Sequence, residues 1–362
     1  MSNEKRIRWG ILGTGWMARH FASGLQFLPE AKLLAVGSRS LGRAQEFARQ
    51  FNLPFAHGDH AALANNSEVD VVYIATPNNK HKEDCFLCLN AGKAILCEKP
   101  FAINATESRE IIALARQKGL FCMEAMWMRF MPLGQKVKEL VEQGTIGDIC
   151  MMSADFGYPV EFSPENRFFN PQLGGGALLD RGVYGLSLAF QLLGAPSGIA
   201  SQASIGKSGV DEQMATILSY PQGALALLSA SMRTYASNEA VIIGSKGKIR
   251  IHAPFYCPQK LSVTEFPKAG LSLTEAGSPK EKLRAAIKEI PVLRNISSNL
   301  GLCKHMVQPF KGNGYNYEAA EVMRCLRSGE VESRIMPLDE TLRIMESMDS
   351  IRRQCGLKYP QE

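Results

Sequence analysis

The sequence lacks several features that mark particular classes of protein. No apolar run approaches the ~20 residues that a membrane-spanning helix needs, so we expect no membrane partner. Residues 1–6 are polar and lead directly into an apolar segment, which leaves no room for a secretory leader. No basic run is interleaved with aromatic residues, and the formal net charge is only +6 over 362 residues. We therefore expect no nucleic-acid partner.

Cysteine is present, but not in a pattern that indicates a metal site. The nine cysteines are an odd number, and Cys85 and Cys88 form the only Cys-x-x-Cys pair, without a second pair or a histidine cluster at zinc spacing. Both fall in a predicted helix over 81–91, where a spacing of three places two small side chains on one face. This favours core packing over metal binding or redox chemistry. We predict a cytoplasmic protein without a metal.

The first third of the chain alternates between strand and helix patterns. Apolar runs at 7–12, 32–38, 69–75 and 94–97 predict strands, and the segments between and after them predict helices that end near 28, 51, 91 and 118. Apolar strands separated by helices are typical of a parallel sheet covered on both faces. We therefore predict a Rossmann domain over residues 1–123.

The rest of the chain, residues 124–362, predicts an α+β domain. Helices are expected at 132–143, from the glycine run 174–176 to about 193, at 317–328 and at 338–355, with a strand at 148–156. Several strands over 199–265, including a hairpin of 239–244 with 248–252, have no helix between them and predict an antiparallel sheet. Within 270–312, a basic amphipathic helix at 280–288 and an irregular stretch at 291–306 could form a lid, an oligomer contact or a mobile loop.

A glycine-rich motif, Gly13-Thr-Gly15-Trp-Met-Ala18, lies between the first predicted strand and the next helix. In that context G-x-G-x-x-G/A binds a dinucleotide, although a tight turn without a ligand is the alternative. Gly13 permits the turn, Gly15 lets the backbone approach a pyrophosphate, and Ala18 allows close packing. The predicted cofactor contacts here are Gly13, Thr14, Gly15, Trp16 and Met17, with ordinary packing as the alternative for Trp16.

The end of the second predicted strand indicates which nicotinamide cofactor is bound. An NAD enzyme places a carboxylate there for the ribose 2′-hydroxyl. This sequence instead has Ser38 and Arg39, with Arg43 one helical turn later. A hydroxyl and two guanidinium groups suit a 2′-phosphate, so we predict NADP, with NAD possible.

Two further segments carry candidate catalytic groups. Glu98-Lys99-Pro100 follows the fourth predicted strand, at the sheet edge where open parallel sheets bind ligands. Asp180 and Tyr184 follow the glycine run and, at a spacing of four, share a helix face. The glycines permit close approach to a ligand, which favours a functional role for this pair.

Together these motifs resemble the Gfo/Idh/MocA oxidoreductase family. The matching segments are Gly13-x-Gly15-x-x-Ala18, Glu98-Lys99-Pro100, Gly175-Gly-Ala-Leu-Leu-Asp180-x-Gly182, Tyr317-Glu-Ala and Met336-Pro-Leu-Asp-Glu-Thr, so the similarity covers essentially the whole chain. The resemblance implies a Rossmann domain followed by a large, mostly antiparallel sheet that often forms a homodimer or higher oligomer.

The sequence departs from many members of this family in an informative way. Tyr184 replaces a histidine, and Ser187 replaces a second aspartate. Tyrosine there resembles the branch that contains dimeric dihydrodiol dehydrogenases and NADP-dependent xylose dehydrogenases. The segment 123–130 also resembles that branch and would line the substrate pocket through Trp127, Arg129 and Phe130, with packing as the alternative for Trp127.

These residues predict hydride transfer to or from a sugar or a cyclic trans-diol. A phenol has a pKa of about 10 and is a poor base at neutral pH, so an ammonium beside it would help by lowering that pKa. The hypothesis makes Tyr184 the acid–base and Lys99 its partner, while Asp180 orients Lys99 or the substrate. A lyase or glycosidase that recycles its cofactor, and a non-catalytic NAD(P) sensor, are the alternatives.

Other site residues are predicted from their position along the chain. Thr76, Pro77, Asn79 and His81 follow the third strand and, with Glu98 and Lys99, should border the nicotinamide. A structural role is an equal alternative for His81. Arg167 and Phe168, just before the glycine run, are expected to line the substrate pocket.

Overall fold

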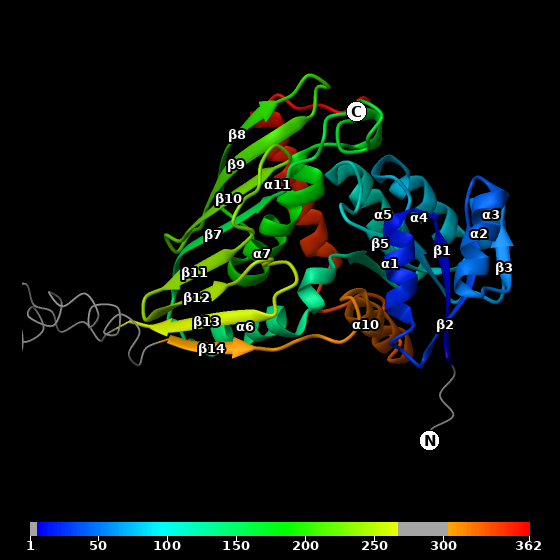
Figure 1. Cartoon of the computed structure of the whole chain (residues 1–362), viewed down its shortest axis with the longest axis horizontal. Coiled ribbons are helices and arrows are strands. Elements are labelled where there is room, and N and C mark those ends of the chain that lie inside the picture. The colour runs from blue at the N-terminus through cyan, green and yellow to red at the C-terminus, as the bar shows by residue number, and fades with distance from the viewer. Residues whose placement is uncertain (1–5, 267–302) are drawn as a thin grey trace, which may run out of the picture.

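The computed structural model describes residues 6–266 and 303–362 and builds them around two sheets (Figure 1). Sheet A has six strands in the order β3-β2-β1-β4-β5-β6, and sheet B has eight in the order β14-β13-β12-β11-β7-β10-β9-β8. The predicted fold class, a Rossmann domain followed by a large and mostly antiparallel sheet, is confirmed.

Sheet A is wholly parallel and is built from the first third of the chain. Its central strands are buried and, apart from Glu98 at the end of one of them, apolar, because helices cover both faces. Its strands are β1 (Ile7–Leu12), β2 (Ala31–Gly37), β3 (Phe55–His57), β4 (Val71–Ile74), β5 (Ala94–Glu98) and β6 (Cys122–Ala125). Its helices are α1 (Trp16–Leu25), α2 (Leu41–Phe51), α3 (His60–Ala64), α4 (His81–Asn90) and α5 (Ala105–Lys118). Cys85 and Cys88 are fully buried in this core, in agreement with the core packing predicted for them.

The helix N-termini of this half differ in how their free N–H groups are satisfied. Ser40, Asp59 and Asn104 accept backbone N–H bonds and so cap α2, α3 and α5. Helix α1 begins after Gly15 and has no side-chain cap. Its N–H groups therefore remain available to a ligand at the carboxyl edge of sheet A.

Sheet B is antiparallel except for the parallel pair of β7 and β10. Its strands alternate between buried and exposed residues, as expected when one face packs on helices. The strands are β7 (Ile149–Gly157), β8 (Gly198–Ile205), β9 (Asp211–Ser219), β10 (Leu225–Ser231), β11 (Ala240–Gly244), β12 (Gly247–Ile251), β13 (Lys260–Glu265) and β14 (Cys303–Val307).

Helices of the second half join the two sheets. Figure 1 shows α7 (Val183–Leu193) and α11 (Leu338–Gln354) on the face of sheet B that looks toward sheet A. Helix α11 also packs against α5, and α10 (Tyr315–Arg327) packs against α1. Helix α6 (Pro132–Glu142) follows a short 3₁₀ turn at Trp127–Phe130. Contacts between these helices therefore fix the half built on sheet B against the half built on sheet A.

Several elements differ from the sequence prediction. Strand β3 and helix α3 were not predicted, because three and five residues are too few for a periodic pattern. Strand β14 occupies part of the stretch predicted to be irregular. The helix predicted from Gly174 is instead a π-helix at Leu178–Gly182 followed by α7. The predicted helix at 280–288 lies outside the described residues. Within 6–266 and 303–362, none of the helices has the length and apolar character needed to cross a membrane.

Candidate active site

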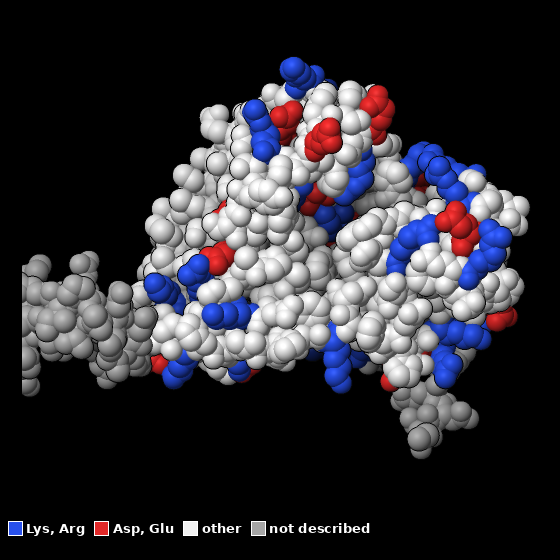
Figure 2. Space-filling model, in the orientation of Figure 1, with Lys and Arg blue, Asp and Glu red and all other residues white. Residues whose placement is uncertain are grey.

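A cleft of about 1020 Å³ opens at the carboxyl edge of sheet A. Figure 2 shows a hollow between the half built on sheet A and the half built on sheet B, with basic and acidic side chains inside it. Many of the predicted site residues line the cleft: Gly13, Thr14, Gly15, Trp16, Met17, Ser38, Arg39, Arg43, Thr76, Pro77, Glu98, Lys99, Arg167 and Phe168. Residues from distant segments thus share one cavity.

The glycine turn after β1 has the shape that a dinucleotide requires. Gly13 has φ +101°, and a Cβ on it would lie 2.6 Å from the Ala75 carbonyl oxygen after β4. Only glycine fits this close approach. A Cβ on Gly15 would meet no atom within 4 Å, so its empty side faces the open cleft beside the uncapped start of α1. These features fit a bound pyrophosphate.

Two guanidinium groups line the cleft beyond the end of β2. Arg39 and Arg43 are exposed, and neither forms an ion pair with any residue in the described part of the chain. Ser38 is nearly buried, and its hydroxyl accepts the Ser40 N–H. The edge therefore offers two unpaired cations and no carboxylate from β2, as a 2′-phosphate would require.

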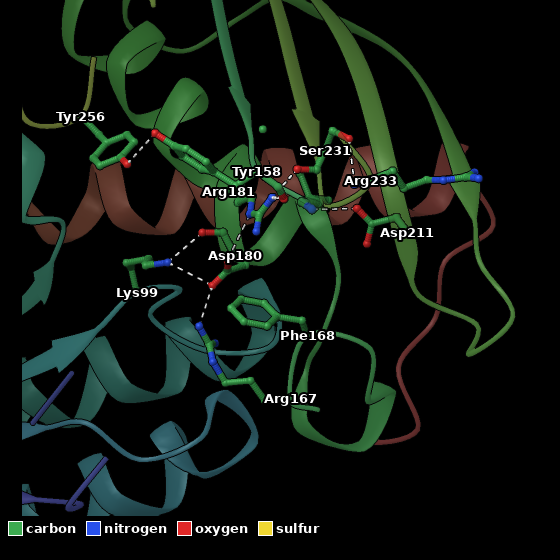
Figure 3. A network of polar contacts seen from close by, with 12 residues as sticks. Lys99, Tyr158, Arg167, Phe168, Asp180, Arg181, Asp211, Ser231, Arg233 and Tyr256 are labelled. Atoms are coloured by element: carbon green, nitrogen blue, oxygen red, sulfur yellow. Dashed lines mark hydrogen bonds and ion pairs between the residues drawn. The ribbon is translucent and has the colours of Figure 1, made fainter. Parts of the chain in front are cut away.

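Lys99 extends from the end of β5 to the π-helix at Leu178–Gly182 (Figure 3). Its Nζ donates to the Asp180 carbonyl oxygen at 2.7 Å and lies 3.4 Å from Asp180 Oδ1. It also lies 4.8 Å from the centre of the Tyr184 ring. The ammonium, the carboxylate and the phenol predicted to act together are therefore adjacent.

Asp180 is held as a carboxylate by three cations. Burial by itself would raise its pKa, but the charges of Lys99, Arg167 and Arg181 outweigh burial and lower the pKa to about 2. The Arg167 and Arg181 guanidinium groups lie 3.1 and 3.6 Å from its oxygens. Asp180 thus stays charged over the whole physiological pH range.

Tyr184 differs from the sequence prediction in its electrostatics. Burial, followed by the charge of Glu98, raises the pKa of Tyr184 well above its usual value. The prediction of a lowered pKa is wrong for this structure, because Lys99 Nζ lies over the ring rather than at the hydroxyl. The Tyr184 hydroxyl instead accepts a hydrogen bond from Trp127 Nε1 at 3.0 Å.

Glu98 belongs to a buried acidic group behind Lys99. The Tyr73 hydroxyl donates to Glu98, and the Lys99 N–H donates to its other oxygen at 3.1 Å. Burial raises the pKa of Glu98 despite these bonds. Glu318 of α10 is fully buried without a hydrogen-bond partner among the described residues, and burial with the charge of Glu98 raises its pKa well above the usual value.

Two residues predicted to border the nicotinamide do not line the cleft. His81 is fully buried, and its two ring nitrogens lie 2.9 and 3.0 Å from the carbonyl oxygens of Pro100 and Thr76. His81 therefore joins the loops after β4 and β5. This is the structural role that the sequence analysis gave as the alternative for His81. Asn79 is also displaced from the cleft; its neighbour Asn78 lines the cleft instead and donates to the Gly174 carbonyl oxygen.

The predicted substrate residues after β6 are buried in the core. Arg129 is 1% exposed and donates to Ser187 Oγ and to the Ser187 carbonyl oxygen, each at 2.7 Å. It also pairs with Glu340, so it joins α7 to α11 and does not reach the pocket. Phe130 is buried in the same core. Trp127 stacks on Tyr315, and its Nε1 donates to the Tyr184 hydroxyl.

The sequence analysis missed a polar group on the opposite wall of the cleft. His60 Nδ1 lies 2.7 Å from Asp84 Oδ1, and Thr76 Oγ1 donates to Asp84 Oδ2 at 2.6 Å. Asp59, which caps α3, lines the cleft beside His60. The only local signal was the capping aspartate, because β3 and α3 are too short to be recognised.

A dinucleotide cleft lined by an ammonium that contacts a carboxylate and a phenol ring defines a class of protein, the nicotinamide-dependent oxidoreductases. The chain belongs to the Gfo/Idh/MocA family within that class. The family model for the oxidoreductase family with an NAD-binding Rossmann fold matches residues 7–126, and the model for the GFO/IDH/MocA C-terminal domain matches residues 135–250.

Curated and solved relatives cover nearly the whole chain. Trans-1,2-dihydrobenzene-1,2-diol dehydrogenase from Mus musculus is 36% identical over 98% of this chain and 99% of its own length. The 3-ketoreductase KijD10 from Actinomadura kijaniata, solved with NADP and TDP-benzene, is 25% identical with a TM-score of 0.79, covering 97% of this chain and 98% of its own. Levoglucosan dehydrogenase, solved with NADH and levoglucosan, shares the fold at 19% identity and a TM-score of 0.81, covering 99% and 100%.

The two glycines of the turn should respond differently to alanine. Gly13→Ala should lower the free energy of unfolding by about 2 kcal/mol or more, because the added Cβ collides with the Ala75 carbonyl at a positive φ. Gly15→Ala should change that free energy by less than about 0.5 kcal/mol, yet weaken dinucleotide binding about tenfold or more by filling the space for phosphate. Chemical denaturation and cofactor titration measure both. Unchanged affinity in Gly15→Ala would contradict the cofactor site.

Proposed function

We propose that this enzyme is an NADP-dependent dehydrogenase or reductase for a secondary alcohol or cyclic hemiacetal of a sugar or trans-dihydrodiol. The observation that carries this proposal is the contact of Lys99, which lines the dinucleotide cleft, with Asp180 and the Tyr184 ring. The names of the relatives, a dihydrodiol dehydrogenase and sugar oxidoreductases, support the substrate class.

The proposed chemistry divides between the cofactor and three side chains. NADP, when bound, supplies the hydride carrier, while the protein binds the substrate and moves its hydroxyl proton. Tyr184 donates the proton to the developing alkoxide during reduction and accepts it during oxidation. The Tyr184 phenol, whose pKa burial raises, stays protonated near neutrality, which suits the donor role.

Lys99 and Asp180 are proposed to fix the substrate oxygen. The Lys99 ammonium stabilises negative charge on that oxygen, and its contacts with Asp180 restrict where the ammonium lies. Arg167 and Phe168 line the same cleft and are proposed to contact the substrate. Asp180 is already paired with cations on three sides, so we propose that it orients Lys99 rather than exchanging protons.

The preference for NADP is proposed from Arg39 and Arg43. Both guanidinium groups face the cleft and are free of ion pairs in the described residues. NADP bound to KijD10 supports this preference, and NADH bound to levoglucosan dehydrogenase shows that the fold also accommodates the other cofactor.

The division of labour along the chain is also a proposal. Residues 1–123 would bind the cofactor, and residues 124–362 would bind substrate and form the subunit contact. All nine cysteines are free thiols, which supports the predicted location in a reducing cytoplasm.

We propose that the outer face of sheet B forms a homodimer. Met151, Ile217, Leu225 and Leu227 are each at least 38% exposed on neighbouring strands β7, β9 and β10. Leu225 pairs with Met151, and Leu227 with Ile217, so these side chains form one apolar surface. Such a surface is typical of a protein contact.

Removing the Tyr184 hydroxyl should reduce turnover selectively. Tyr184→Phe should lower kcat by about 10² to 10⁴, the usual contribution of an acid–base group, while the NADP dissociation constant stays within about twofold. The assay is absorbance of the reduced nicotinamide with pentoses, hexoses and cyclic trans-diols. Tyr256→Phe, a phenol 5.5 Å away between ring centres, is the control and should retain turnover. Near-normal kcat in Tyr184→Phe would contradict the mechanism, and product formation without net NADPH would indicate the recycling alternative.

Removing the two arginines should affect NADP more than NAD. The double variant Arg39→Ala, Arg43→Ala should weaken NADP binding about tenfold or more and NAD binding by less than about threefold, because only NADP carries the 2′-phosphate. Binding is measured by titration calorimetry. Arg49→Ala, at the far end of α2, controls for the loss of positive charge. Equal loss for both cofactors would contradict this role.

A charge on the outer face of sheet B should separate the subunits. Leu227→Arg should give a monomer by light scattering after size-exclusion chromatography, because a dry interface cannot accommodate an unpaired guanidinium group. Val331→Arg places the same charge at another exposed apolar residue, outside sheet B, and should leave the dimer intact. A monomeric wild type, or a dimeric Leu227→Arg, would contradict the proposed interface.

A further inference from the structure

We propose that Asp211 is a positioning residue for the reaction: its carboxylate holds the start of the π-helix Leu178–Gly182 and thereby fixes Asp180 and Lys99. This inference rests on the proposed roles of Asp180 and Lys99. Asp211 is the first residue of β9, and it touches neither the cleft nor the ammonium. It acts through the backbone of the segment that carries the site.

The π-helix lacks an N-terminal cap of its own. The preceding residues are Gly174-Gly-Gly-Ala177, and Ala177 at the cap position has no side chain that can accept a hydrogen bond. Asp211 supplies that acceptor from another strand, because its Oδ2 accepts the Leu178 N–H at 2.7 Å. The charge also lies at the positive end of the helical segment, which favours an anion.

The glycine run is shaped around this carboxylate. Gly176 has φ +122°, and a Cβ on it would collide with Asp211 Oδ1. The Tyr359 hydroxyl donates to the neighbouring Gly175 carbonyl oxygen at 2.6 Å. Asp211 and Tyr359 therefore hold the backbone immediately before the π-helix from two elements, β9 and the segment after α11.

The other side of the π-helix is held by Arg181. Its Nη1 donates to the carbonyl oxygens of Tyr158 and Ser231, at the ends of β7 and β10 (Figure 3). Asp180 lies between Leu178 and Arg181, so the backbone carbonyl that binds Lys99 is fixed from both directions. π-helices are frequent at functional sites, and this one needs anchors outside its own segment.

Burial opposes the charge on Asp211. Asp211 is 1% exposed, and its Oδ1 has no hydrogen-bond partner among the described residues. Burial raises its pKa to about 7, while the Leu178 and Ala177 amides and the charge of Arg352 on α11 oppose that rise. Tyr359 is the other titratable group that faces it, and Arg352 is itself paired with Asp349 and Glu362.

The sign of the pH effect follows from that pKa. Below pH 7 Asp211 is protonated and a weaker acceptor, and above pH 7 it is ionised and holds the Leu178 amide more strongly. Turnover of the wild type should therefore contain a component that rises as the pH passes upward through about 7. Asparagine keeps an oxygen acceptor but cannot ionise.

The test compares Asp211→Asn with the wild type and with Glu124→Gln. Glu124 is a matched control, because it is also fully buried with a pKa raised to about 7, but it lies on β6 outside the π-helix. Asp211→Asn should lower kcat about 10- to 100-fold, as a misplacement of about 1 Å does, with the NADP dissociation constant within about twofold. It should also lose the component of the pH profile near 7. Glu124→Gln should retain that component.

Backbone hydrogen exchange over residues 175–184 provides a second measurement that does not depend on turnover. Asp211→Asn should speed exchange there by about tenfold, and Glu124→Gln should not. Unchanged exchange, or faster exchange with wild-type kcat, would overturn the positioning role. If Asp211→Asn does not fold, Tyr359→Phe decides, with exchange faster at 175–184 and kcat lowered about threefold. A wild type that turns over no substrate would reject the proposed function, whereas exchange would still decide whether Asp211 holds the helix.

Discussion

The contact between the Lys99 ammonium and Asp180 joins the two halves of the molecule at the site. Lys99 comes from the end of a sheet A strand, and Asp180 comes from a helical segment packed on sheet B. Their side chains are only 10% and 14% exposed, so water screens the pair weakly and each charge depends on the other. The Tyr184 ring lies beside the same contact, because Tyr184 is four residues after Asp180 and the Lys99 Nζ is 4.8 Å from the ring centre.

Neither local segment determines this contact by itself. The Lys99 backbone is fixed by burial of β5 and by His81, which binds the loops after β4 and β5. Asp180 depends on a run of glycines, which has no conformational preference strong enough to form a defined turn. Its geometry must therefore come from surrounding strands, through Asp211, which accepts the Leu178 N–H, and through Arg181, which donates to carbonyl groups at strand ends. The cost of burying those charged groups is met by the packing of the rest of the domain.

The sequence predicted those parts of the fold and site whose signals are local. Strands of buried apolar residues, the turn at Gly13 and the arginines after β2 each have a short pattern with a physical meaning. Arg129 was misassigned because its partners, Ser187 and Glu340, are distant in sequence, and an arginine near a pocket resembles one that binds substrate. His60 was missed because β3 and α3 are too short to show a period. The roles of such residues depend on burial and on pairing between distant segments, and neither is visible in the sequence of one segment.

Burial of the Tyr184 phenol makes a nearby cation important for the proposed chemistry. Burial excludes water, which strengthens each electrostatic interaction but also raises the pKa of Tyr184, so a phenolate there needs a nearby cation. Lys99 is that cation, yet in this structure it lies over the ring, held by Asp180. A substrate oxygen placed between Nζ and the phenol would bridge the remaining gap, since it can accept from the ammonium and exchange its proton with Tyr184 in one arrangement. In the proposed mechanism the substrate itself would complete the proton path, which would confine acid–base chemistry to molecules that bring a hydroxyl or carbonyl oxygen to that point.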